Sequence, residues 1–155
     1  PQGKVNPLLL AFASGYTWIA RGYAYDVKGL KELIKEGIAH RGLAFLHVLQ
    51  PCPTYNDLHT KEWFAPRLYR LEEEGYDPLV PPGLPPEALE ARMARFQQKA
   101  LEWGERIPVG VFWKAELPTF EARLKAYLPR YPEAYPARGP ETPLDLEGLL
   151  QEFAL

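Results

Sequence analysis

The sequence predicts an α/β fold with a mainly parallel sheet, and one strand–helix–strand unit near the amino terminus carries this prediction. Residues 16–20 are β-branched and aromatic, which is typical of a strand. Residues 43–49 form a nearly continuous apolar run, which is typical of a strand covered on both faces. Between them, apolar residues recur at helical spacing. Because the connections are short, the two strands must be parallel and the crossover right-handed.

Length and composition exclude several classes of protein. The chain has 155 residues, enough for one domain with its own core, and is 46% hydrophobic and 25% charged. No apolar run is long enough to span a bilayer, so we predict no membrane association. A net charge of −2 argues against a nucleic-acid binder. The single cysteine cannot form an internal disulfide, which favours a reducing compartment, and we predict the cytoplasm.

The first elements have clear start and stop signals. Asn6 is the expected N-cap of a short helix that begins at Pro7 and ends at Gly15. Asp26 caps the helix of the strand–helix–strand unit, and Gly42 is expected to end it. The apolar stripe of this helix is Leu30, Leu33, Ile34 and Ile38. Two parallel strands need neighbours and the chain starts at Pro1, so we expect an upstream part to be missing.

The second half is predicted to contain short elements joined by stiff segments, because twelve of the seventeen prolines follow Tyr76. A helix is expected over residues 60–75, begun or kinked by Pro66, and an irregular connector over residues 76–86. Another helix is expected over residues 86–103, ended by Gly104. Its apolar stripe is Leu89, Met93, Phe96, Ala100 and Trp103.

A late strand is expected over residues 107–113, with an edge position for at least its first part because of Pro108. Thr119 is expected to cap a helix over residues 120–128, and residues 145–153 are expected to form a last amphipathic segment. We therefore divide the chain into a strand–helix–strand part, 1–58, and a helical, proline-rich extension, 59–155. The extension packs either on the same domain or on a partner subunit.

Cys52 is the best functional candidate in the chain. It follows the second strand directly and lies between Pro51 and Pro53, so its backbone is stiff. The carboxyl ends of strands are where open α/β sheets bind their ligands. A free cysteine is usually a small buried core residue, but a core residue does not need flanking prolines, whereas a thiolate ligand needs a fixed direction. One cysteine cannot hold zinc or an iron–sulfur cluster, so any metal site requires ligands from elsewhere.

The histidines and one arginine have more ordinary interpretations. His40 is expected to cap the helix after Asp26, where a cation favours the helix dipole. His47 is expected to be a hydrogen-bonded core residue, and His59 a surface residue. Arg21 is expected at a strand end, where it contacts an anion or, as we prefer, forms a salt bridge.

Several segments are similar to the β subunit of 2-oxoacid:ferredoxin oxidoreductases, and the most specific is Gln50-Pro51-Cys52-Pro53-Thr54-Tyr55-Asn56. The other similar segments in the first third are residues 6–7, 15–22, 30–35, 42–45 and 48–49. Further on, the similar positions are Trp63, residues 77–78, 107–114 and 118–121. Tyr76 stands where the family commonly has histidine. The resemblance covers the chain to about Glu121.

This resemblance implies the carboxyl-terminal half of a thiamine-diphosphate-binding α/β domain. It implies an enzyme that decarboxylates a 2-oxoacid on thiamine diphosphate and passes electrons through iron–sulfur clusters to ferredoxin, leaving an acyl-coenzyme A. The family motif for the diphosphate and Mg²⁺ lies upstream of the matched region. By resemblance, Cys52 is the distant fourth ligand of a four-iron four-sulfur (4Fe–4S) cluster.

The implied partners are the α subunit, the missing amino-terminal part of the β subunit, ferredoxin, the 2-oxoacid and coenzyme A. The chain alone is expected to be inactive. The alternative is a non-catalytic interaction domain of the same fold, in which Cys52 is only a packing residue.

Overall fold

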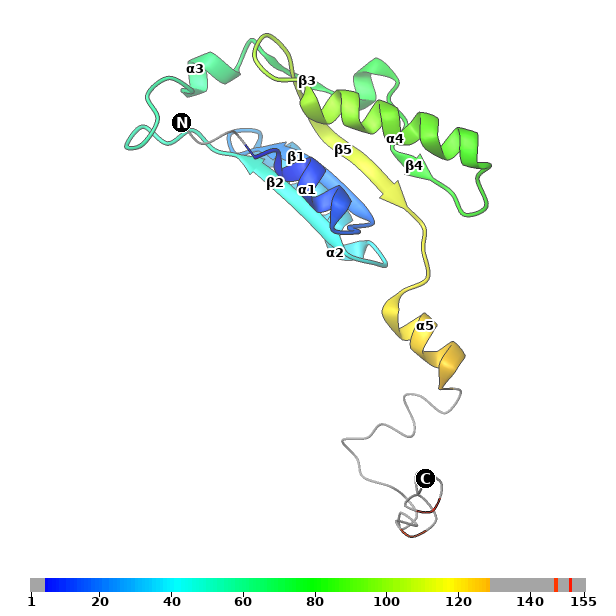
Figure 1. The fold of residues 1–155 in the computed structure, drawn as a ribbon. Helices are drawn as coiled ribbons and strands as arrows, with labels where there is room; N and C mark the ends of the chain where they lie inside the picture. The colour runs from blue at the N-terminus through cyan, green and yellow to red at the C-terminus, as the bar shows by residue number, and fades with distance from the viewer. Residues whose placement is uncertain (1–4, 129–146, 148–150, 152–155) are drawn as a thin grey trace. The chain divides into compact units, whose positions relative to one another are not determined.

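The computed structural model of the chain describes residues 5–128, 147 and 151, and the chain divides into two units (Figure 1). The first unit ends at Leu117 and the second begins at Pro118. The helices and strands of the first unit are α1 (Pro7–Ala13), β1 (Trp18–Tyr23), α2 (Val27–Ala39), β2 (Ala44–Leu49), α3 (Lys61–Phe64), β3 (Leu68–Arg70), the 3₁₀ turn η1 (Glu72–Glu74), β4 (Leu79–Val80), α4 (Pro86–Leu101) and β5 (Ile107–Ala115). The second unit contains α5 (Phe120–Tyr127). Most of the predicted segment 145–153 lies outside the described residues.

The strands form one sheet with the order β2-β1-β5-β3, and β4 pairs with the far end of β5. β1 and β2 are parallel, with Trp18 opposite Ala44 and Tyr23 opposite Leu49, which confirms the predicted strand–helix–strand unit. β3 and β4 are also parallel to β5, whereas β1 and β5 are antiparallel. The sheet is therefore mainly parallel, as predicted.

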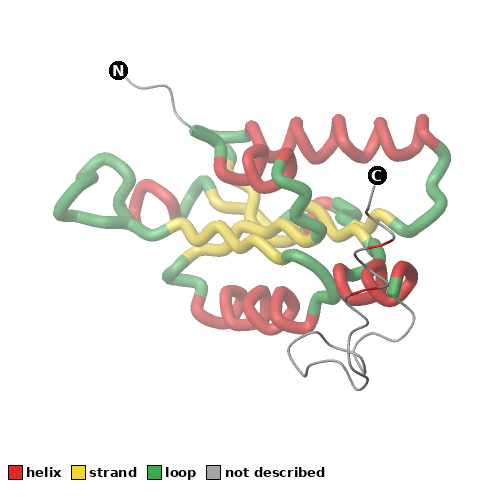
Figure 2. The backbone as a smooth tube through the Cα atoms, turned by 60° about the horizontal axis from the view of Figure 1, so that its bottom comes forward, coloured by secondary structure: helices red, strands yellow, loops and turns green. Residues whose placement is uncertain are grey.

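Helices cover both faces of the sheet, with α1 and α4 on one face and α2 on the other (Figure 2). Phe45 of β2 contacts Tyr16 on the α1 side, with ring centroids 5.6 Å apart. Gly22 of β1 faces α2, and a Cβ atom there would lie 2.8 Å from Cδ1 of Leu30. The absence of a side chain at Gly22 is therefore what lets α2 lie this close to the sheet.

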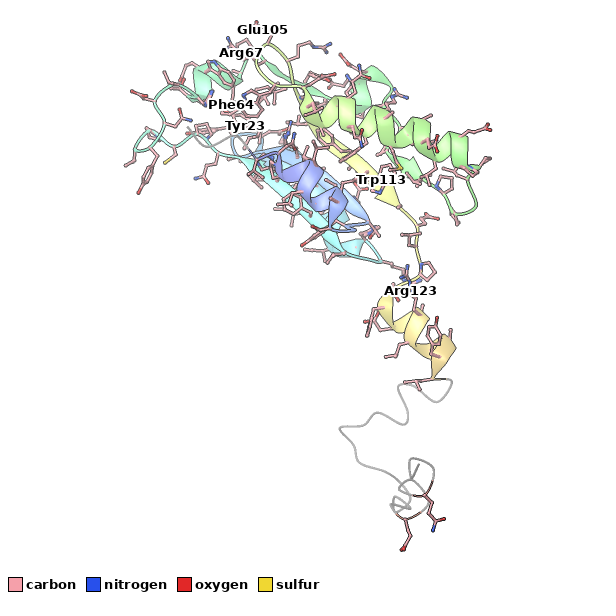
Figure 3. The ribbon with its side chains drawn as sticks, viewed as in Figure 1. Tyr23, Phe64, Arg67, Glu105, Trp113 and Arg123 are labelled. Atoms are coloured by element: carbon pink, nitrogen blue, oxygen red, sulfur yellow. The ribbon has the colours of Figure 1, made fainter. Side chains whose placement is uncertain are left out.

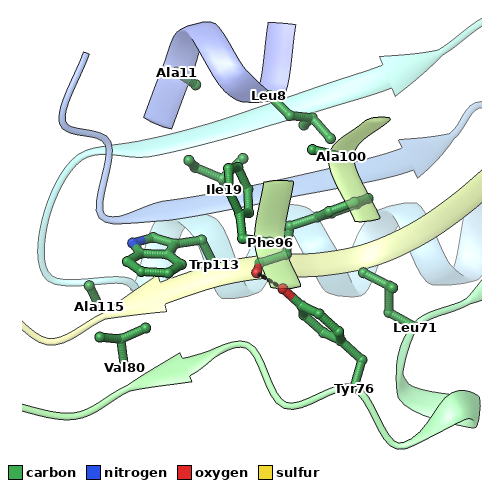
Figure 4. Close-up of a cluster of buried hydrophobic side chains, with 11 residues drawn as sticks. Leu8, Ala11, Ile19, Leu71, Tyr76, Val80, Phe96, Ala100, Trp113 and Ala115 are labelled. Carbon is green, nitrogen blue, oxygen red and sulfur yellow. Dashed lines mark hydrogen bonds between the residues drawn. The ribbon is translucent and has the colours of Figure 1, made fainter. Parts of the chain in front are cut away.

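The main core lies between the sheet and the pair α1 and α4 (Figure 4). Phe96 of α4 stacks on Phe12 of α1 at 4.7 Å, and Trp113 of β5 meets Phe12 edge-on at 4.9 Å. Tyr76 closes the cluster, because its hydroxyl donates a hydrogen bond of 2.7 Å to the carbonyl of Phe112. A second, smaller core lies at the carboxyl end of β1 and comprises Tyr23, Leu49, Phe64, Ile107 and Val109.

The predicted helix caps are confirmed. Oδ1 of Asn6 accepts hydrogen bonds from the amides of Leu8 (3.0 Å) and Leu9 (3.2 Å). The carboxylate of Asp26 accepts from the amide of Gly29 at 3.0 Å, and the hydroxyl of Thr119 caps α5. None of the described helices is long and apolar enough to cross a membrane.

The helix predicted over residues 60–75 is wrong. Only Lys61–Phe64 is α-helical, after Pro66 the chain enters β3, and the 3₁₀ turn η1 follows β3. Two backbone hydrogen bonds tie this segment to β5: the amide of Ile107 donates to the carbonyl of Arg67, and the amide of Leu71 donates to that of Val109. Pairing with β5 therefore overrides the local helical preference of these residues. The range predicted as an extension thus contributes β3, β4 and β5 to the sheet, rather than one strand.

Pro108 lies in the central strand of the sheet. The first part of β5 nevertheless pairs on one side only, since its ladder with β3 covers residues 107–109 and its ladder with β1 begins at Gly110. The amide of Ile107 and the carbonyl of Val109 both bond toward β3. The missing N–H of Pro108 is therefore on the side without a ladder, which is why proline is tolerated there.

Several element boundaries differ from the prediction, and one strand was not expected. β1 continues to Tyr23, so Arg21 lies inside the strand. α2 ends at Ala39, with His40 as its C-cap, before Gly42. α4 ends at Leu101, so Trp103 lies beyond it, and the predicted connector contains β4.

The expectation that β2 is covered on both faces is not met in the described chain. β2 is the last strand of the sheet, and of its residues only Leu49 is buried. α2 also has no buried residue, and two members of its predicted apolar stripe are exposed, Ile34 at 45% and Ile38 at 80%. An apolar surface therefore lies along this edge of the sheet.

Candidate functional site

Cys52 lies on the loop that joins the carboxyl end of β2 to α3, as predicted. Its thiol is free and half-buried. Its carbonyl accepts hydrogen bonds from the amides of Tyr55 (3.2 Å) and Asn56 (2.8 Å), so the chain turns tightly here. Pro51 and Pro53 fix φ on either side. The sulfur is therefore carried by a stiff turn directly after a parallel strand.

Asn56 organises the rest of this loop. Its Oδ1 accepts hydrogen bonds from the amides of Leu58 (3.1 Å) and His59 (3.0 Å), which places its amide nitrogen toward Nδ1 of His59 at 2.9 Å. Because Nδ2 of Asn56 can only donate, Nδ1 of His59 must be the acceptor. The neutral His59 ring therefore has its proton on Nε2.

His59 belongs to a cluster of aromatic rings that we call the aromatic cluster. Its members are Tyr23, His59, Trp63, Phe64 and Trp103. His59 lies 4.4 Å from Trp63 and 6.0 Å from Trp103 between ring centroids, and Phe64 lies 5.5 Å from Tyr23. The cluster joins the carboxyl end of β1, the loop after β2, α3 and the segment after α4. His59 is thus half-buried against this cluster, and the predicted surface position is met only in part.

Two buried donors in this region have no hydrogen-bond partner among the described residues: the hydroxyl of Tyr23 and Nε of Arg67. Figure 3 shows both residues near Phe64 at the same end of the first unit. Burial raises the pKa of the Tyr23 hydroxyl, so this group stays protonated and able to donate. The Arg67 guanidinium lies 4.6 Å above the Trp63 ring and donates to the Trp63 carbonyl at 2.7 Å. This end of the sheet therefore offers donors and a positive charge.

Arg21 is buried in the sheet, with 2% of its surface exposed, and the predicted salt bridge is wrong. No carboxylate of the described residues pairs with it. Its Nε donates to Nδ1 of His47 and its Nη1 to the carbonyl of Pro108, both at 3.4 Å. Its guanidinium lies 5.3 Å from the Phe112 ring and 5.9 Å from the Trp103 ring. The charge is therefore offset by aromatic faces and neutral acceptors.

The remaining histidines are neutral structural residues. Burial and the Arg21 charge lower the pKa of His47 to about 4, which agrees with its predicted role as a hydrogen-bonded core residue. His40 is the C-cap of α2 as predicted, but burial and the nearby Lys114 lower its pKa. Its Nε2 lies 2.8 Å from the Thr17 hydroxyl. His40 therefore links the end of α2 to Thr17, the residue before β1, by a hydrogen bond, and its lowered pKa does not favour a cation at the helix end.

No group of three or more His, Cys, Asp or Glu residues within residues 5–128, 147 and 151 is arranged to hold a metal ion. Cys52 is compatible with one bond from a thiolate to an iron atom, but the described residues do not complete a cluster site. They also lack a set of carboxylates for a diphosphate-bound Mg²⁺. Cys52 is the one thiol among the described residues.

The sequence did not reveal the aromatic cluster or its unpartnered donors. Trp103 was assigned to the stripe of the preceding helix, and Tyr23 and Arg67 were not singled out. The cluster comes from four separate segments and has no periodicity, so only the tertiary structure brings its members together. The one available signal is that Trp63 lies near the start of one predicted helix and Trp103 at the end of another.

The comparisons with known proteins agree with one another. Residues 52–128 match the family described as pyruvate ferredoxin oxidoreductase β subunit, C terminal. The β subunit of a 2-oxoacid:ferredoxin oxidoreductase from a Sulfolobus species is 54% identical over 136 residues, covering 86% of this chain and 44% of that protein. The corresponding subunit of Saccharolobus solfataricus is 47% identical over 160 residues, covering 97% of this chain and 51% of that protein.

A solved structure has the same fold. It is a 2-oxoglutarate:ferredoxin oxidoreductase from Magnetococcus marinus with 2-oxoglutarate, coenzyme A and succinyl-CoA bound. The TM-score is 0.66 at 24% sequence identity, and the match covers 100% of this chain and 46% of that chain. This chain thus spans about half the length of the proteins it matches.

Proposed function

Because the chain belongs to the family of 2-oxoacid:ferredoxin oxidoreductase β subunits, we propose that it acts as the carboxyl-terminal half of such a subunit. The complete enzyme converts a 2-oxoacid and coenzyme A to an acyl-coenzyme A and carbon dioxide, and passes the electrons to ferredoxin. All the named relatives are enzyme subunits, so the non-catalytic alternative is not favoured.

The observation that carries the proposal for this chain is the position of Cys52. Its half-buried thiol lies on a stiff turn directly after β2, on the same loop as His59, which packs in the aromatic cluster. An iron–sulfur cluster with thiolate ligands is anionic, and hydrogen bonds and nearby charges tune its reduction potential. We assign to Cys52 the role of one ligand of a 4Fe–4S cluster, with the other ligands coming from outside the described residues.

Thiamine diphosphate and Mg²⁺ belong to the same proposal, but this chain is not their main binding element. When bound, thiamine diphosphate stabilises the carbanion that decarboxylation produces. The described residues contain no group suited to its metal ion. We therefore assign the binding of thiamine diphosphate and Mg²⁺ to the rest of the β subunit. We infer that the complete β subunit assembles with the α subunit, and that the assembled enzyme binds the 2-oxoacid, coenzyme A and ferredoxin. A lone cysteine is in keeping with work in a reducing compartment, for which we propose the cytoplasm.

The test uses the complete complex of α and β subunits with Cys52→Ala. We expect loss of iron and sulfide from one cluster and a fall in ferredoxin reduction of at least about tenfold, because a missing ligand weakens cluster binding. The matched control is Thr54→Ala, an exposed position on the same loop, which should keep both properties. Unchanged cluster content together with unchanged ferredoxin reduction in Cys52→Ala would reject the assignment.

A further inference from the structure

Arg21 is a buried cation to which the proposed function gives no role. It lies on β1, between β2 and β5 in the sheet, and only 2% of its surface is exposed. None of the ion pairs among residues 5–128, 147 and 151 includes it. Burying a charge without an ionic partner is costly, because the charge loses its hydration. The sheet therefore carries this group at the expense of its own stability.

The contacts of Arg21 reduce the cost of its burial but do not cancel its charge. The faces of Phe112 and Trp103 attract the guanidinium through their quadrupoles, and a ring has no net charge. The carbonyl of Pro108 is neutral, and so is His47 at pH 7, because burial and the Arg21 charge lower its pKa to about 4. A full positive charge therefore remains inside the fold, where salt screens it less than it screens an exposed charge.

This charge lies near the loop that carries Cys52. Arg21 is opposite His47 in the β1–β2 ladder, and Cys52 follows His47 by five residues. Even a fully extended chain would limit the distance between the Cα atoms of His47 and Cys52 to about 18 Å. The side chains give a second connection, since the Trp103 ring contacts both Arg21 and, at 6.0 Å between ring centroids, His59 of the Cys52 loop. Protein therefore connects Arg21 to this loop by two routes.

We propose that Arg21 raises the reduction potential of the iron–sulfur cluster that Cys52 binds. The inference rests on the proposed function, because it takes Cys52 to be a cluster ligand. Reduction adds an electron to a cluster that is already anionic, so a fixed positive charge nearby stabilises the reduced form more than the oxidised form. Arg21 acts through its electric field and is not a ligand. It makes the cluster a stronger electron acceptor.

The experiment is a redox titration of the complete complex of α and β subunits, followed by electron paramagnetic resonance. The signal that disappears in Cys52→Ala identifies the relevant cluster. We expect Arg21→Met, which keeps a long side chain but removes the charge, to shift the midpoint potential of this signal to a more negative value. A midpoint potential equal to that of the wild type would overturn the proposal.

Two variants of His47 separate the effect of charge from that of packing. Nδ1 of His47 accepts a hydrogen bond from Nε of Arg21 at 3.4 Å, and an oxygen of Asp or Asn can take its place as acceptor. His47→Asp and His47→Asn have nearly the same shape, but only the Asp side chain neutralises Arg21. We expect a more negative midpoint potential in His47→Asp than in His47→Asn, whose potential stays close to that of the wild type. Equal potentials in the two variants would also overturn the proposal.

The failure of this inference is distinguishable from the failure of the proposed function. If Cys52→Ala removes one cluster signal and the potential of that signal is unchanged in Arg21→Met and His47→Asp, only the role of Arg21 is rejected. If Cys52→Ala leaves every cluster signal in place, the role of Cys52 is rejected and the role of Arg21 with it.

Discussion

Arg21 is a buried charge in the middle of the sheet, and its surroundings explain why the chain tolerates it. Burial lowers its pKa to about 10, so it remains a cation at neutral pH. Aromatic faces attract a cation, by roughly 2 kcal/mol when the pair is desolvated. Phe112 and Trp103 lie close enough to contribute, and His47 accepts a hydrogen bond because its own ring is neutral. Arg21 and His47 therefore stabilise the sheet only while His47 is unprotonated.

This dependence predicts that acid destabilises the fold. The pKa of His47 is about 4 in the folded chain against an ordinary value of 6.5, so the unfolded chain binds the proton more readily. The contribution of His47 to stability is fully present above about pH 6.5 and is lost as the pH falls toward 4. We expect His47→Gln to reduce the difference in the free energy of unfolding between pH 7 and pH 5, measured with urea. Part of the pH dependence should remain in this variant, because His40 is still present and its pKa is also lowered. An identical pH dependence in the variant would contradict this account.

Tyr76 has a packing role in the structure. Its side chain is 7% exposed and its hydroxyl bonds to the carbonyl of Phe112. We expect Tyr76→Phe to lower the free energy of unfolding by about 1–3 kcal/mol, because a buried carbonyl loses its donor. Urea unfolding measures the change. An unaltered midpoint and slope would show that the hydrogen bond contributes nothing.

At the scale of elements, Asn6 connects two helices. Its Oδ1 caps α1, and its Nδ2 donates to the carbonyl of Ala100 near the end of α4 at 2.7 Å. We expect Asn6→Ala to cost about 1–2 kcal/mol in the free energy of unfolding, as for other N-cap losses. Asn6→Asp keeps the cap but lacks the donor to Ala100, so the difference between the variants separates the two contributions. Equal stability of wild type and Asn6→Ala would reject this role.

The sequence was informative where local signals act alone. Caps at Asn6, Asp26 and Thr119, and the parallel pair β1 and β2, were predicted correctly because side-chain caps and periodicity are local properties. β3 was missed because its strand conformation depends on pairing with β5, some forty residues away along the chain. The boundary of β1 was placed too early, and this error turned buried Arg21 into a strand-end residue.

The candidate site also has one part that local sequence signals predict and another part that they do not. The position of Cys52 after β2 follows from the apolar run and two prolines, so the sequence alone was sufficient to predict where this residue lies in the fold. The aromatic cluster and the unpartnered donors of Tyr23 and Arg67 depend on contacts among four segments. No spacing in the sequence reports such contacts.

At the scale of the whole molecule, the described residues contain one thiol, that of Cys52, for which we propose the role of a cluster ligand. We therefore predict that the isolated chain, after treatment with iron and sulfide under anaerobic conditions, retains no stable 4Fe–4S cluster. The physical reason is that the described residues place no further ligands beside Cys52. Ultraviolet–visible spectroscopy and iron analysis after desalting check this. Tight retention of a cluster by the isolated chain would mean that the remaining ligands lie within it.

The most direct measurement of the central claim is an experimental density map of the assembled complex of α and β subunits. We predict continuous density from Sγ of Cys52 to an iron atom of a cluster next to the carboxyl end of β2. A map in which the Cys52 thiol is packed among side chains, with every iron atom bonded to other residues, would contradict it.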